Sequence, residues 1–217
     1  MIVMLENGDQ QGPFRVLLGH GAGAAMTSPF LEQMTTLLAE RGLAVTRFEF
    51  SYMAARRSGG PKRPPPRAEN LMPEFLAAIA QVKNAMPKAQ KLFVGGKSLG
   101  GRVASMIADE VYTRGEIAGL ICLGYPFHAP TQPGKMRTAH LEKLTCPALI
   151  VQGDRDPFGS RSEIEAVTLS PAIQLHWLGD GDHDFGPRGA SGFTRKGNLT
   201  STADAVAQFV AAPIASR

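Results

Sequence analysis

A serine between glycines stands directly after an apolar run of the kind that forms a buried strand. The segment LFVGGKSLGGR covers residues 92–102 and places Ser98 between Gly96 and Gly100. Glycines in such an arrangement occur in phosphate-binding loops, in dinucleotide-binding turns and in the sharp turn that presents a nucleophilic serine. The neighbouring residues and their spacing distinguish these three kinds of site.

Two of the three kinds of site fit the sequence poorly. A phosphate-binding loop needs a glycine five residues before the glycine of Gly-Lys-Ser, and that position is Lys91. A dinucleotide-binding turn fits better at GHGAGA, residues 19–24, with Glu49 as the ribose-binding acid. Its helix should begin within the glycines, whereas the cap signal Ser28-Pro29 comes several residues later. The dinucleotide site therefore remains a minor alternative.

The Gly-x-Ser-x-Gly spacing predicts that Ser98 is a nucleophile on a tight turn between a strand and a helix. Such a serine needs a histidine as base and an acid that orients this histidine. In this arrangement the order along the chain is serine, acid, histidine. The segment ALIVQGDRDPFG offers Asp154 and Asp156 as the acid, and GDGDHDF offers His183 as the base.

The other histidines fit the role of base less well than His183. His128 and His140 precede both candidate acids, and His176 lies inside an expected strand, where a structural role is favoured. His20 belongs to the early glycine segment and is expected to hold that loop. Order and position together select His183.

An oxyanion hole needs two backbone N–H donors beside the serine. One should be Leu99, the residue after the nucleophile, and the other should come from the loop after the first core strand. That loop is GHGAGA, which favours the N–H of Ala22 as the second donor. The early glycines then have a purpose that requires no cofactor.

The acidic loop DGDHD has an alternative interpretation as a metal site. The calcium-binding pattern requires glycine at its sixth position and glutamate at its twelfth, but counting from Asp180 gives Phe185 and Ser191. Solvated loop groups are the favoured interpretation of the carboxylates of Asp180, Asp182 and Asp184, and a looser divalent-cation site made by these three is the minor alternative. Neither a metal nor an organic cofactor is expected.

Short apolar runs alternate with amphipathic segments along the chain. Strands are expected at 14–20, 43–50, 91–98, 117–127, 147–154 and 173–182, and helices at 28–42, 69–86, 99–115, 160–170 and 201–214. Strands that are apolar throughout and alternate with helices indicate an open, mostly parallel α/β sheet with helices on both faces. Ligands bind such sheets beyond the carboxyl ends of the strands, where every motif named above lies.

Composition limits the class of protein. The 217 residues are 43% hydrophobic and 19% charged, which suits one globular domain over residues 1–217. A net charge of +4 does not by itself indicate nucleic acid, and no apolar run is long enough to span a membrane. Cys122 and Cys146 are expected to be buried thiols. A cytoplasmic protein with a small-molecule substrate is the expectation, because no signal peptide is evident.

One long irregular insertion is expected at residues 51–69, SYMAARRSGGPKRPPPRAE. It gathers Arg56, Arg57, Lys62, Arg63 and Arg67 among prolines and glycines. A solvated, mobile loop is the favoured interpretation. The alternative is a gate that faces the substrate, since the segment follows a strand on the ligand side of the sheet.

The assembled motifs resemble the α/β-hydrolase superfamily. The similarity extends to a small family of predicted hydrolases related to a subunit of a eukaryotic histone acetyltransferase complex, and distantly to dienelactone hydrolases. It rests on GHGAGA, GGKSLGGR, GYPFHAP, PALIVQGDRDPFG and GDGDHDF, which span nearly the whole chain in order. The resemblance implies Ser98 as nucleophile, Asp156 as acid and His183 as base.

The chain departs from larger hydrolases at two places. Few residues precede the first core strand, so the leading antiparallel strands should be missing or reduced, and 126–147 leaves no room for a cap domain. The sequence thus predicts a minimal serine hydrolase acting on a small ester. The alternative is a binding or scaffold protein that keeps the fold without catalysis.

Overall fold

The computed structural model describes residues 2–213. Within this range, seven strands form one sheet in the order β1-β3-β2-β4-β5-β6-β7. The bounds are β1 Met4–Asn7, β2 Phe14–Gly19, β3 Ala44–Phe48, β4 Lys91–Lys97, β5 Gly119–Leu123, β6 Ala148–Gly153 and β7 Ile173–Leu178. All neighbouring pairs are parallel except β1 with β3. The predicted open, mostly parallel α/β sheet is confirmed.

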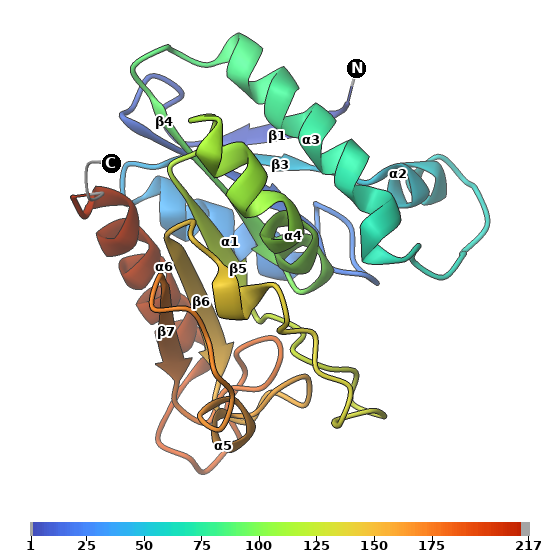
Figure 1. Ribbon diagram of the computed structural model, residues 1–217, viewed down its shortest axis with the longest axis vertical. Helices are drawn as coiled ribbons and strands as arrows, with labels where there is room; N and C mark the ends of the chain where they lie inside the picture. Colours follow the sequence, from blue (N-terminus) through green and yellow to red (C-terminus); the bar gives the residue numbers. More distant parts are fainter. Residues whose placement is uncertain (1, 214–217) are drawn as a thin grey trace.

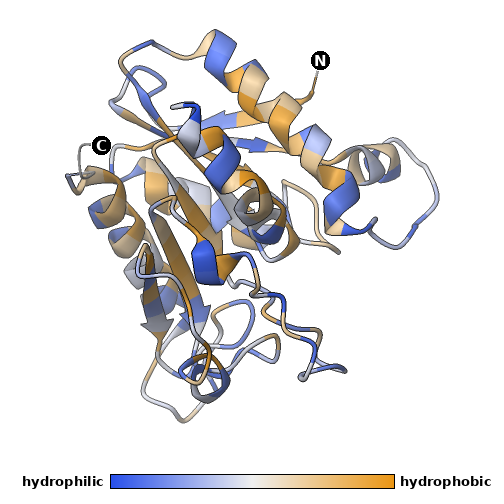
Figure 2. Ribbon diagram, in the orientation of Figure 1, coloured by the Kyte–Doolittle hydropathy of each residue, from blue (hydrophilic) through white to orange (hydrophobic). Residues whose placement is uncertain are grey.

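Helices cover both faces of the sheet (Figure 1). Their bounds are α1 Pro29–Ala39, α2 Ser51–Arg57, α3 Ala68–Ala85, α4 Leu99–Thr113, α5 Arg161–Ile164 and α6 Arg195–Ala211, with a 3₁₀ turn at Leu141–Lys143. Alternate residues of a strand point to opposite faces, so the sheet has two cores. Val94 packs with α3 and α4, whereas Phe93 packs with α1 and α6. In Figure 2 the central strands are accordingly hydrophobic along most of their length.

Helix α1 begins where the sequence predicted. The Ser28 hydroxyl accepts a hydrogen bond from Leu31 N, and Pro29 occupies the first turn. A proline there loses no helical hydrogen bond, because the first N–H groups have no partner within the helix. The late start leaves residues 20–28 as a loop, which is incompatible with a pyrophosphate held at the helix N-terminus within GHGAGA.

The leading part of the sheet is reduced to one strand that the sequence did not predict. Strand β1 is only four residues long and pairs antiparallel with β3, with Met4 opposite Phe48. Short strands carry too few alternating positions to be recognised from sequence. Residues 126–147 add a loop and the short 3₁₀ turn but no cap domain.

Three expected helix boundaries were wrong, and two strands end four residues before their expected ends, β5 at Leu123 and β7 at Leu178. Residues 51–57 form helix α2 rather than irregular chain. The alanines and arginines of this segment favour a helix. The carboxylate of Glu74 in α3 accepts hydrogen bonds from Ser51 N and Ser51 Oγ, at the start of the helix. Helix α5 ends at Ile164, before β-branched residues and Pro171 that do not favour its continuation. Helix α6 begins at Arg195 rather than residue 201, because Thr194 caps Gly197 N. Residue 214, the expected end of that helix, lies outside the described range.

The remaining irregular part of the basic insertion, residues 58–67, is mostly exposed. Arg57 is not part of it, since its guanidinium pairs with the buried carboxylate of Glu49 at 2.9 Å. We expect limited trypsin digestion to cut first within 58–67, after Lys62 or at the start of α3 after Arg67, because exposed loops free of regular hydrogen bonding are the preferred sites of nicking.

Mass spectrometry of the first fragments checks this expectation. Arg114, exposed at the end of α4, is the internal comparison because Gly115 follows it in a tight turn. A first cut after Arg114 would show that 58–67 is held more firmly than its exposure indicates.

No helix among the described residues is both long enough and apolar enough to cross a bilayer. Cys122 and Cys146 are both buried, as predicted.

Candidate active site

Ser98 lies at the sharp turn between β4 and α4. Its backbone has φ 50° and ψ −110°, in the left-handed half of the map that non-glycine residues rarely occupy. Such a conformation costs on the order of 1–3 kcal/mol and persists only where the surrounding structure imposes it. The predicted strand-turn-helix setting of this serine is therefore present, with the strain that such a turn requires.

The flanking glycines are needed for a close approach to β2. A Cβ at either Gly96 or Gly100 would lie 2.3 Å from the carbonyl oxygen of Gly19. That distance is well below any van der Waals contact, so a side chain at either position would push the turn away from the sheet. The glycine spacing thus follows from backbone packing around Ser98.

Asp156 and His183 are joined directly. His183 Nδ1 lies 2.8 Å from Asp156 Oδ2. The Asp156 carboxylate is fully buried, and it also accepts hydrogen bonds from Phe158 N at 2.8 Å and from Gln152 Nε2 at 3.0 Å. With its carboxylate held by these donors, Asp156 favours the tautomer in which His183 Nδ1 carries the proton.

The three predicted residues lie along one edge of the sheet. Ser98 follows β4, Asp156 follows β6 and His183 follows β7, and these strands run parallel through β5. Ser98 N donates to Leu123 O at the end of β5, which fixes the turn to the neighbouring strand. Among the hydrogen bonds made by residues 2–213, none joins Ser98 Oγ to His183.

His183 is partly open to solvent. Its side chain is 21% exposed, and the Phe158 ring lies against it with a centroid separation of 4.3 Å. Burial on the side of Asp156 and exposure on the other side leave Nε2 as the ring atom that can face a bound molecule.

Asp154, the other candidate for the acid, does not cap the turn after β6 with its side chain. Its Oδ1 is buried without a hydrogen-bond partner in the described chain. The turn is held instead by backbone bonds, including Arg161 N to Asp154 O and Asp156 N to Gly153 O. Of the two aspartates, only Asp156 contacts His183.

One carboxylate of the acidic loop around His183 is buried in ion pairs. Asp180 is 7% exposed and pairs with both Arg155 and Arg188. Hydrogen bonds from Arg188 keep the pKa of the Asp180 carboxyl well below its usual range. Asp182 Oδ1 accepts from Asp184 N and Gly186 N. The interpretation of these carboxylates as solvated groups is therefore wrong for Asp180, whereas Asp182 and Asp184 are exposed, as expected.

The arrangement of these carboxylates does not match a metal site. Among residues 2–213, no group of three or more histidine, cysteine, aspartate or glutamate side chains is placed to hold an ion. The oxygens of Asp180 face arginines.

The early glycine loop passes beside Ser98. A Cβ at Gly21 would lie 3.9 Å from Ser98 Cβ. Neither Ala22 N nor Leu99 N donates a hydrogen bond to another described residue, and Tyr52 Oη holds the Ala22 carbonyl at 3.0 Å. Leu99 is the first residue of α4, so its N–H belongs to the electropositive end of a 15-residue helix. Two unused donors thus occur in the two segments where the sequence placed them.

His20 is a structural histidine in this loop. It is fully buried, its Nδ1 lies 2.7 Å from Gly21 O, and its Nε2 accepts from Phe50 N at 3.2 Å. Both ring nitrogens are therefore used by the backbone in the neutral form. In a trans peptide the N–H points away from the carbonyl, so the bond to Gly21 O also orients Ala22 N.

Acid should destabilise the fold through its buried histidines. Desolvation lowers the pKa of His20, His140 and His176 from the ordinary value of 6.5. Below that pH the unfolded chain binds protons that the folded chain does not, so stability falls as pH decreases. We expect His20 to contribute at most about 1.4 kcal/mol per pH unit.

Denaturant titrations at pH 7 and pH 5 check this expectation, with His20→Gln compared with the parent. The variant should be less stable at pH 7 but should lose less stability on acidification. An equal loss in both proteins would show that His20 does not contribute to the pH dependence.

Two polar residues near the site were not singled out from the sequence. Gln152 interrupts the apolar run of β6, is fully buried, and donates to Asp156. Lys97 precedes Ser98, is 6% exposed, and donates to His183 O at 2.6 Å. A polar or charged residue inside an otherwise apolar strand was the available signal for both.

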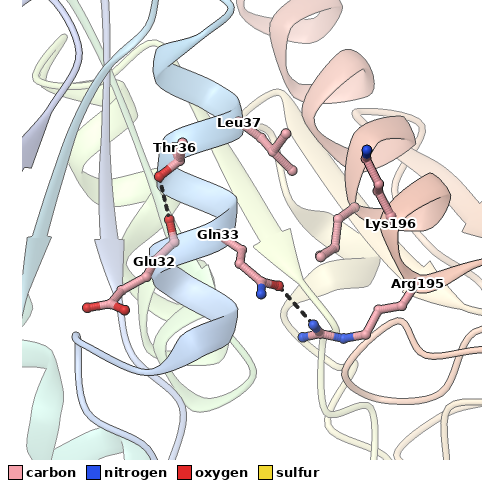
Figure 3. Close-up of a pocket in the computed structure, with 7 residues that line it drawn as sticks. Glu32, Gln33, Thr36, Leu37, Arg195 and Lys196 are labelled. Carbon is pink, nitrogen blue, oxygen red and sulfur yellow. Dashed lines mark hydrogen bonds between the residues drawn. The ribbon is translucent and has the colours of Figure 1, made fainter.

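A groove of about 540 Å³ lies elsewhere, between α1 and α6 (Figure 3). It is lined by Glu32, Gln33, Thr36, Leu37, Arg195, Lys196 and Leu199. Arg195 crosses it to donate to Gln33 Oε1 at 2.8 Å, and its Nε also contacts Asp184 O at 3.3 Å. The groove contains neither Ser98 nor His183, so it is separate from the candidate active site.

Comparison with known proteins agrees with this fold. A family described as "Alpha/beta hydrolase domain" matches residues 13–211. An alpha-beta serine hydrolase homologue from Coxiella burnetii superposes with a TM-score of 0.69 at 17% identity, covering 97% of this chain and 91% of that one. Est1E from Butyrivibrio proteoclasticus, solved with ferulic acid, gives 0.70 at 15% identity, covering 97% and 96%. A dienelactone hydrolase from Anabaena variabilis gives 0.68 at 17% identity, covering 95% and 90%.

Proposed function

The chain belongs to the alpha/beta hydrolase family, and on this premise we propose that it is a serine hydrolase that cleaves a small carboxylic ester. The observation that carries the proposal is the pairing of a strained serine at the start of α4 with a histidine bound to a buried aspartate, all at one edge of the sheet. Strained, non-glycine backbone concentrates at functional sites.

The first half of the proposed reaction forms an acyl-enzyme. Ser98 Oγ attacks the carbonyl carbon of the ester while His183 Nε2 takes the hydroxyl proton. Asp156 keeps the other ring proton on Nδ1 and stabilises the imidazolium that forms. The tetrahedral intermediate then collapses, the bond from carbon to the leaving oxygen breaks, and His183 returns the proton to the departing alcohol.

The second half releases the acid. His183 takes a proton from water, the hydroxide attacks the acyl carbon, and the bond to Ser98 Oγ breaks as Oγ recovers its proton. In both halves negative charge develops on the carbonyl oxygen, where the N–H groups of Leu99 and Ala22 are the proposed donors. Each such donor is typically worth about 10²–10³ in rate.

The contact between Ser98 and His183 forms in this mechanism only as substrate binds. Hydrogen bonds between catalytic groups are often long or misaligned in free enzymes and tighten in the complex. His183 is partly exposed, and residues 126–147 form no cap domain. The His183 ring therefore has room to move toward Ser98.

The choice of an ester rests on relatives and on simplicity of the site. Est1E carries ferulic acid in its structure, and a carboxylic acid is the kind of product that ester hydrolysis releases. Another relative is a dienelactone hydrolase, and a lactone is a cyclic ester. The proposed chemistry uses only side chains and backbone of this chain. The relationship to a histone acetyltransferase complex subunit, the scaffold alternative and the role of residues 58–67 as a gate stay predictions.

A fluorophosphonate probe tests the proposal. The probe reacts with serines that an adjacent base activates, so it should label the protein stoichiometrically at Ser98, as mapped by mass spectrometry. Ser98→Ala should not be labelled, and an ester panel of increasing acyl length should then identify the preferred substrate. A folded protein that the probe leaves unlabelled would favour the scaffold alternative instead.

A further inference from the structure

Lys97 connects the strand that carries Ser98 to the loop that carries His183. Lys97 is the last residue of β4 and directly precedes Ser98. Its Nζ donates a hydrogen bond to the main-chain oxygen of His183 at 2.6 Å, across 86 positions of sequence. A single side chain thus links the two residues between which the proposed proton transfer takes place.

The lysine is enclosed rather than solvated. Its side chain is 8% exposed, and Nζ lies 5.2 Å from the centroid of the Phe30 ring and 5.8 Å from that of Phe185. The carboxylate of Asp184 is the nearest acid, at 3.5 Å. The ammonium therefore has a defined position between two rings, one carboxylate and the carbonyl of His183.

The neighbouring strand leaves room for this ammonium. Gly124, directly after β5, has φ 65°, and a Cβ there would lie 2.9 Å from Lys97 Nζ and 3.1 Å from His183 O. A side chain at this position would displace one or both atoms. The path of Lys97 to His183 therefore depends on a glycine as well as on the lysine.

Burying the charged side chain of Lys97 costs free energy that a well-packed apolar side chain would not cost. Burial lowers the pKa of Lys97, and the charge of Asp184 opposes this effect only in part. An apolar residue of similar volume would fill the space without the cost of removing a charge from water. The presence of a charged lysine here is consistent with a need for the directed hydrogen bond from Lys97 Nζ to His183 O.

We propose that Lys97 is a positioning residue that holds His183 at the distance and orientation needed to take the proton from Ser98. The inference rests on the proposed function, because it assigns Lys97 a role relative to those two residues. The hydrogen bond from Lys97 Nζ goes to the main-chain oxygen of His183. We therefore expect Lys97 to affect the placement of the His183 ring and not the binding of substrate.

The decisive variant is Lys97→Met, which keeps chain length and apolar contacts but removes the hydrogen bond to His183 O. We expect kcat for the preferred ester to fall about 100-fold, since misplacement of a catalytic group by about 1 Å has an effect of that order. KM should change little. The downfield proton signal of the hydrogen bond between His183 and Asp156 should weaken or broaden in the NMR spectrum.

Two matched variants separate placement from charge. Lys91→Met makes the same change at the exposed, opposite end of β4, and its kcat should stay close to that of the parent. Asp184→Asn removes the acid partner but leaves the bond from Lys97 to His183 O, and it should lose far less kcat than Lys97→Met. If Lys97→Met does not fold, Lys97→Gln, which is too short to reach His183, is expected to show the same loss of kcat.

The outcomes distinguish this inference from the proposed function. A folded Lys97→Met protein with parental kcat overturns the inference, as does an increase in KM at unchanged kcat, which would place Lys97 on the substrate. If Ser98→Ala retains activity, the proposed function fails. If Ser98→Ala is inactive while Lys97→Met is unaffected, only the role of Lys97 is wrong.

Discussion

Ser98→Ala should abolish ester hydrolysis, with kcat falling about 10⁶-fold, because a nucleophile and its base act as a unit. Stability should change little. The Ser98 hydroxyl makes no hydrogen bond within the described chain, and alanine carries the same Cβ through the strained turn at φ 50°. The measurements are kcat with the preferred ester and the midpoint of denaturant unfolding.

Ser105→Ala is the matched control on the same helix. Ser105 is 2% exposed, and its hydroxyl lies 2.7 Å from Arg102 O and 2.9 Å from His140 Nε2. This variant should lose about 1 kcal/mol of stability, as for a typical buried hydrogen bond, while keeping its activity. Parental activity in Ser98→Ala would mean that another group is the nucleophile.

Asp156→Asn should lower kcat/KM by roughly 10⁴, the size of effect that loss of tautomer control has in serine proteases. Phe158 N and Gln152 Nε2 both donate to the Asp156 carboxylate. If the asparagine oxygen keeps the bond to Phe158 N, its amide group faces His183 Nδ1. The ring must then accept at Nδ1 and carry its proton on Nε2, where it can no longer take the proton of Ser98.

Asp154→Asn provides the comparison two residues away. Asp154 Oδ1 has no hydrogen-bond partner in the described chain, and its side chain does not contact His183. We expect a change of about 1 kcal/mol or less in stability and a small change in rate. Measuring kcat/KM and the denaturant midpoint for both variants decides the assignment, and the reverse pattern would make Asp154 the orienting acid.

The general position of the candidate site could be predicted because its parts are local. Ser98, Asp156 and His183 each come shortly after an apolar run that forms a strand, and each is marked by nearby glycines. In a parallel sheet the carboxyl ends of neighbouring strands meet at one edge. Identifying the strands was therefore enough to predict that these three residues, which are distant in sequence, lie at the same edge of the sheet.

Two of the helix boundaries that were wrong, those of α2 and α6, depended on tertiary contacts. Helix α6 begins in RKGN, which has weak helical propensity, yet Asn198 there binds Gly179 O and Phe185 O and Leu199 packs in the core. Helix α2 begins at Ser51, which Glu74 holds. In both cases a partner from another segment stabilises a turn of helix that local propensity leaves undecided.

The sequence by itself determined the parallel sheet, the turn at Ser98 and the two segments that supply Asp156 and His183, because strand patterns and glycine spacing are properties of short stretches. The family resemblance already favoured Asp156 over Asp154, in agreement with the hydrogen bond to His183. Only the tertiary structure decided that Asp180 is bound by two arginines and that Lys97 reaches the His183 carbonyl. Which polar side chains contact one another depends on which of them face each other once the core is packed. Spacing along the chain does not specify the direction in which each side chain points.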